Sequence, residues 1–70
     1  MRYQDKLGRV FEVKYRAGAG DGKPWLVAWR TPSGRLRRYN SPNCPLRQTQ
    51  AEAQADLDAQ AARHGWEKWP

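Results

Sequence analysis

The sequence predicts an α+β fold: a three- to four-stranded antiparallel β-meander with one C-terminal α-helix packed on one face. Two observations predict it. Over residues 2–40, short runs of alternating apolar and polar residues are separated by turns that contain Gly or Pro. Residues 49–64 form instead an alanine-rich run with capping residues at both ends. At 70 residues the chain has room for one core, so we expect a single domain over residues 1–70.

The first strands lie before a glycine-rich loop at residues 17–23. Residues 3–5 and 9–16 are predicted strands, joined by a turn that contains Gly8. Side chains alternate between the two faces of a strand. One face of the longer strand therefore carries Phe11, Val13 and Tyr15, and the other carries Glu12, Lys14 and Arg16.

A β-hairpin is the strongest local signal. Residues 24–30 and 35–40 are predicted strands around Thr31-Pro32-Ser33-Gly34, which favours a type I turn with a left-handed glycine bulge. This turn places Trp29 opposite Arg37 and Val27 opposite Tyr39. One sheet face then carries Trp25, Val27, Trp29 and Tyr39, and the other carries Leu26, Ala28, Arg30, Leu36 and Arg38.

Residues 41–48 form a connector, because Pro42 and Pro45 cannot continue a ladder; the sequence leaves open whether either bond is cis. Thr49 and Glu52 form a capping box, which predicts a helix over about 49–64 that ends at Gly65. This helix carries a narrow apolar stripe, formed by Ala53, Leu57 and Ala61. We expect the stripe to pack on the sheet face that carries the bulky aromatic residues. Whether the tail, residues 65–70, adds an edge strand stays open.

The composition argues against several functions. No apolar run reaches the roughly 18 residues that cross a bilayer, and the first residues lack an apolar signal-peptide core, so we expect a cytoplasmic protein without membrane contact. Cys44 and His64 are the only residues of their kinds, and neither lies beside a Gly-rich oxyanion turn. We therefore expect no enzyme activity, metal, cofactor or small-molecule substrate. Cys44 is expected to be partly buried, His64 to interact with the last helix carbonyls, and Asp56 and Asp58 to be solvated.

Positive charge is concentrated in the predicted sheet. The formal net charge is +6, but residues 1–47 hold eleven basic and three acidic side chains, and residues 48–70 hold two basic and four acidic ones. This asymmetry favours a surface that faces a polyanion. The candidate nucleic-acid-binding residues are Lys14, Arg16, Arg30 and Arg38 on the face away from the helix, with Arg35 and Arg37 at the end of the hairpin.

Three functions follow from these features. The first is nucleic-acid binding, in which arginines on a β-ribbon read guanine and neutralise phosphates. The second is docking on an acidic protein surface, with exposed Trp66 and Trp69 as anchors. The third is a structural domain with internal aromatics. The sequence does not distinguish DNA from RNA or indicate an oligomeric state.

Residues 25–62 carry a family resemblance. The hairpin WLVAWRTPSGRLRRY followed by TQAEAQADLDAQAA resembles the small arm-type DNA-binding domains at the N-termini of phage-type integrases. The resemblance implies a three-stranded sheet that faces DNA with one helix behind it. It also implies an origin in a prophage or mobile element. The positions that match the DNA-facing strands are Arg30, Arg35, Arg37 and Arg38.

Overall fold

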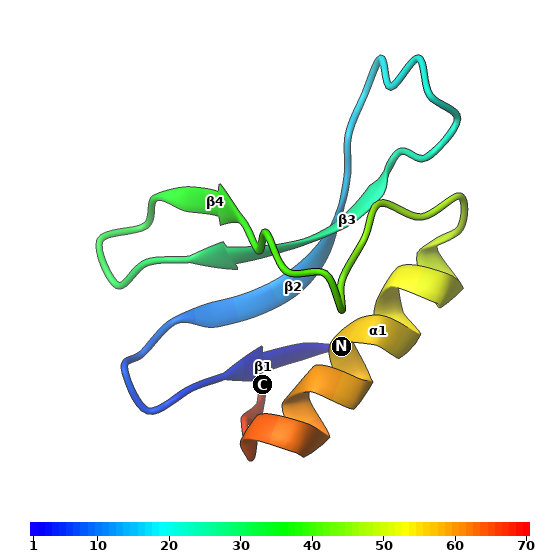
Figure 1. Ribbon diagram of the computed structural model, residues 1–70. Coiled ribbons are helices and arrows are strands. Elements are labelled where there is room, and N and C mark those ends of the chain that lie inside the picture. Colours follow the sequence, from blue (N-terminus) through cyan, green and yellow to red (C-terminus); the bar gives the residue numbers. More distant parts are fainter.

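A computed structural model describes all 70 residues and shows one antiparallel sheet with a helix across one face (Figure 1). The five strands lie in the order β4-β3-β2-β1-β5. Their bounds are β1 Arg2–Gln4, β2 Val10–Tyr15, β3 Trp25–Arg30, β4 Leu36–Arg38 and β5 Glu67–Trp69, and helix α1 spans Gln50–His64. The α+β class and the C-terminal helix are confirmed, and the sheet has one strand more than the largest number predicted.

The additional strand is β5, formed by the tail whose conformation the sequence left open. Gly65 adopts a left-handed conformation (φ 71°) after the last residue of α1 and reverses the chain. Strand β5 then pairs antiparallel with β1, Tyr3 opposite Lys68. The two ends of the chain therefore lie on neighbouring strands (Figure 1).

The β3–β4 hairpin has the predicted turn and register. The Gly34 N–H donates to the Thr31 carbonyl (2.8 Å), the Thr31 N–H donates to the Arg35 carbonyl (2.9 Å), and Gly34 has φ 92°. A positive φ at this position is what a glycine bulge requires. Trp29 lies opposite Arg37, as the turn predicted.

The connector returns to the edge of the sheet. Trp25 and Arg47 exchange two backbone hydrogen bonds, of 3.1 and 2.9 Å, beyond the end of β4, and no peptide bond is cis. Within the connector the chain turns inward at Cys44, which is 1% exposed. Burial, reinforced by the charge of Asp56, raises the pKa of the Cys44 thiol to about 11. Cys44 is thus more deeply buried than expected.

The core lies between α1 and the aromatic face of the sheet. Phe11, Val27 and Leu57 are almost completely buried. The ring of Trp66 stacks on Phe11 with 3.9 Å between centroids. Tyr3, Cys44 and Ala61 complete the buried cluster. The small side chains of α1 let it approach the bulky rings closely, as the apolar stripe predicted.

The helix caps differ from the prediction in one detail. The Glu52 N–H donates to Thr49 Oγ1 (3.2 Å), as a capping box requires. The Thr49 hydroxyl itself donates to the Glu52 carboxylate (3.0 Å), so this carboxylate bonds the capping side chain. At the other end the Trp66 N–H donates to the Ala61 carbonyl (2.9 Å), which is the six-residue bond of a Schellman motif.

Two acidic residues of α1 accept hydrogen bonds. Asp58 is exposed to solvent, as predicted, whereas Asp56 is half-buried, so the prediction of a solvated side chain was wrong for Asp56. Asp56 accepts from Nε and Nη2 of Arg47 (2.8 and 3.0 Å), and Asp58 accepts from the Tyr3 hydroxyl (2.7 Å). The hydrogen bond to Asp58, together with burial, raises the pKa of Tyr3. These contacts fix α1 to the connector and to β1. The spacing of residues within the helix does not predict them, because their partners lie in other segments.

The side-chain contacts of His64 also differ from the expected bonds to helix carbonyls. Its ring stacks on Trp66 at 5.2 Å and forms a hydrogen bond of 3.2 Å with Gln60 Oε1. Phe11, Trp66 and His64 therefore form a continuous stack from the core to the surface.

Candidate nucleic-acid interface

The sheet has one face that no helix covers, here called the open face. Strand pairing places twelve residues on it: Arg2, Gln4, Val10, Glu12, Lys14, Leu26, Ala28, Arg30, Leu36, Arg38, Glu67 and Trp69. Helix α1 lies against the other face, where it contacts β2 and β3. The open face therefore carries three of the predicted binding residues, from three neighbouring strands.

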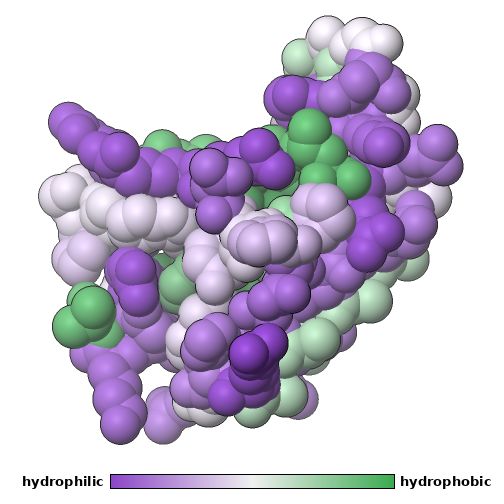
Figure 2. All heavy atoms as spheres, in the orientation of Figure 1, coloured by the Kyte–Doolittle hydropathy of each residue, from purple (hydrophilic) through white to green (hydrophobic).

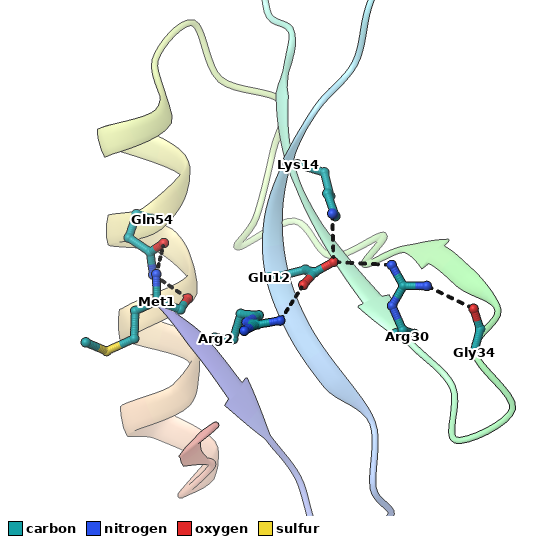
Figure 3. Close-up of polar contacts among 7 residues, drawn as sticks. All are labelled: Met1, Arg2, Glu12, Lys14, Arg30, Gly34 and Gln54. Carbon is teal, nitrogen blue, oxygen red and sulfur yellow. Dashed lines mark hydrogen bonds and ion pairs between the residues drawn. The ribbon is translucent and has the colours of Figure 1, made fainter. Parts of the chain in front are cut away.

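A carboxylate lies at the centre of the open face, and three cations surround it (Figure 3). Glu12 Oε1 is 3.1 Å from Lys14 Nζ and 3.7 Å from Arg30 Nη2, and Glu12 Oε2 is 4.0 Å from Arg2 Nη1. We call these four residues the Glu12 cluster. Although the Lys14 ammonium is within reach of Oε1, its angle is not that of a hydrogen bond, and this buried oxygen accepts none.

The flanking side chains bury Glu12. Its side chain is 10% exposed although no structural element crosses this face. Ala28, directly opposite Glu12 on β3, is also buried. The neighbouring cations have long aliphatic stems, and such stems commonly cover a protein surface while the charged ends stay accessible. The side chains of Arg2, Lys14 and Arg30 are each more than 40% exposed.

Arg16 lies away from this cluster. Its Nη2 donates to both carboxylate oxygens of Asp21 (3.0 and 2.8 Å) in the glycine-rich loop. The Lys23 backbone N–H and the Arg16 guanidinium lower the pKa of Asp21. Arg16 thus closes the base of the loop between β2 and β3, and the structure does not bring it to the other predicted residues.

The hairpin arginines are Arg35, Arg37 and Arg38, and they form a different group. All three are exposed, and none has a side-chain hydrogen bond or an ion pair. Arg38 lies opposite Ala28 on the open face, and Arg37 lies opposite Trp29 on the face of α1. Figure 2 shows a strongly hydrophilic surface over β4. Six other basic residues each face a carboxylate: Arg2, Arg9, Lys14, Arg16, Arg30 and Arg47.

Sequence reasoning missed two parts of this site. Glu12 was placed on the correct face by strand alternation, but its role as the centre of a cation cluster was not predicted. Arg2 was left outside the first predicted strand, so no pattern in the sequence indicated that it lies beside Glu12. Its guanidinium lies over the Trp69 ring, 4.6 Å from the centroid, and Trp69 belongs to the strand that the sequence left open.

Two further structural findings concern other classes of site. No group of three or more His, Cys, Asp or Glu side chains lies close enough together to hold a metal ion. The single helix is neither long nor apolar enough to span a membrane.

Comparisons with protein-family models, with curated proteins and with solved structures found no match to this chain.

Proposed function

We propose that this chain is a small DNA-binding domain that contacts duplex DNA through the β3–β4 hairpin and the adjoining open face. The observation that carries the proposal is the group of hairpin arginines, three exposed cations within four residues and without acidic partners. Unpaired cations are available to neutralise phosphates, and this neutralisation supplies a large share of the affinity of proteins for DNA.

The position of the hairpin suits a groove. Strands lie about 4.8 Å apart, so a five-stranded sheet is too wide for a major groove of about 12 Å. The β3–β4 hairpin is a two-stranded ribbon at the edge of the sheet, and its turn, residues 31–35, lies away from α1 and beyond the pairing of β3 with β2 (Figure 1). Arg30 and Arg38 project from the same face of this ribbon. The hairpin can therefore enter the groove while the rest of the open face lies along the backbone.

Salt dependence tests the proposal. Each neutralised phosphate contributes about 0.9 to the slope of log affinity against log salt, so three hairpin contacts predict a slope near −2.7. Fluorescence anisotropy with a labelled duplex of about two helical turns, between about 50 and 200 mM salt, measures it. A steep negative slope is expected. Salt-independent binding, or none at low salt, contradicts the proposal.

A second candidate function is binding of an acidic protein segment, which the edge of β4 favours. Strand β4 pairs only with β3, so its outer edge has unpaired backbone groups, and Leu36 is 45% exposed between the arginines. An extended acidic peptide could add there as a sixth strand. A labelled poly-glutamate peptide, measured in parallel with the duplex, separates the two functions, because tighter binding of the peptide at equal salt favours the protein partner.

A further inference from the structure

Arg30 is held at two points although it is accessible to solvent. Its Nη1 donates to the Gly34 carbonyl (3.0 Å), and its Nη2 lies 3.7 Å from Glu12 Oε1 (Figure 3). The Arg30 side chain is still 44% exposed. Because a guanidinium has five N–H donors, two such contacts leave three free, enough for a bidentate contact with a ligand. The guanidinium of Arg30 is thus oriented before a ligand binds, and it still has free N–H donors.

Glu12 is the unusual residue of this arrangement. A carboxylate whose side chain is nine-tenths buried, with one oxygen that accepts no hydrogen bond, is unfavourable unless cations compensate it. On an uncovered sheet face a polar or aliphatic side chain would avoid that cost. The three cations converge on Glu12 from β1, β2 and β3, and Glu12 therefore determines where their charged groups lie.

The hairpin arginines provide the contrast. Arg38 is on the same open face, opposite Ala28, but makes no contact that would orient its guanidinium. A freely rotating cation suits a phosphate, which accepts from many directions. A fixed guanidinium suits a guanine, whose O6 and N7 accept two parallel hydrogen bonds in one geometry. The open face therefore carries two kinds of cation.

We infer that Glu12 is a positioning residue that orients Arg30 to read a guanine in the major groove, whereas the hairpin arginines neutralise phosphates. This inference rests on the proposed function. It assigns sequence preference to the Glu12–Arg30 pair and sequence-independent affinity to Arg35, Arg37 and Arg38. It also predicts a loss of sequence preference that a simple charge argument does not predict. Glu12→Gln raises the formal net charge from +6 to +7 and by charge alone would leave any sequence preference intact.

The experiment is selection from a duplex library with a randomised core, followed by anisotropy on the selected site and on a copy with one G·C pair changed to A·T. The wild-type chain should prefer the G·C pair by roughly tenfold or more. Glu12→Gln should lose this preference and bind both duplexes at least as tightly as the wild type binds the changed one. Arg30→Lys keeps the charge but has no bidentate fork, and it should lose the preference as well.

Arg38→Gln is the matched control. It should keep the preference, bind both duplexes more weakly and reduce the salt slope by about 0.9. Retention of the full preference by Glu12→Gln and Arg30→Lys overturns the inference, as does wild-type binding without any sequence preference. Those outcomes leave the proposed function standing. Absence of duplex binding by the wild-type chain removes the proposed function and this inference together.

Discussion

Leu57 is the residue on which the contact between helix and sheet most depends. It is completely buried between α1 and the aromatic face. Leu57→Ala should lower the free energy of unfolding by about 2–5 kcal/mol, because it removes apolar contacts and leaves a cavity. Chemical denaturation followed by Trp fluorescence measures the change.

The chain offers the same substitution at an exposed position. Leu7, in the turn after β1, is 72% exposed, and Leu7→Ala should change stability by less than about 0.5 kcal/mol. Equal effects of the two substitutions would mean that the helix packs elsewhere.

Asp5 gives stability a defined pH dependence. Burial by itself would raise the pKa of its carboxyl, but hydrogen bonds from the backbone and guanidinium of Arg9, the charge of Arg9 and the Leu7 N–H together hold the pKa below its ordinary value. A lowered folded-state pKa stabilises the fold above the unfolded-state value of about 3.9, and this stabilisation is lost as pH falls through the folded-state pKa.

Thermal unfolding of the wild type and of Asp5→Asn between about pH 2 and 7 tests this dependence. The variant should be less stable near neutral pH, and the two midpoints should converge as the pH falls below about 4. Parallel curves over the whole range would show that Asp5 does not contribute.

At the level of single residues, the sequence indicated faces but not partners. Alternation placed Glu12 and Lys14 on one side of β2, because that property is local to the strand. The ion pair of Arg16 with Asp21 depends on how the glycine-rich loop folds back, and the pair of Arg47 with Asp56 on how the helix docks. Such pairs form between segments that the sequence does not place relative to one another.

Among the elements, α1 depends most clearly on its caps. The Thr49 hydroxyl accepts the Glu52 N–H, one of the first-turn donors without a helical partner. Thr49→Ala should therefore cost about 1 kcal/mol of unfolding free energy, within a range of about 0.5–2. Urea denaturation measures this loss. Thr49→Ser retains the hydroxyl and should remain near the wild-type value, and an equal loss in both variants would argue against the cap.

The elements differ in how far the sequence could predict them. The β3–β4 hairpin was predictable in register, because Thr31-Pro32-Ser33-Gly34 defines both the turn and the bulge. Helix α1 was predictable in its bounds because both caps are local signals. Strand β5 has only three residues and pairs with β1 from the opposite end of the chain, so no local pattern marks it.

For the molecule as a whole, the folded structure shows which of the predicted basic residues have acidic partners. The predicted patch combined six basic residues according to their positions along the chain. In the structure, Lys14 and Arg30 share Glu12, and Arg16 pairs with Asp21. Of these six residues, only the hairpin arginines lack an acidic partner. The proposed interface is accordingly narrower than the basic half of the sequence and centres on one edge of the sheet.

The most direct test of this account compares two variants of equal charge. Replacement of Arg35, Arg37 and Arg38 by Gln lowers the formal net charge from +6 to +3, and so does replacement of Lys23, Arg63 and Lys68, which lie away from the hairpin. Anisotropy against salt should show the hairpin variant losing about 2.7 of the log-log slope, with the control close to wild type. Equal losses in the two variants, or an unchanged hairpin variant, would contradict the account.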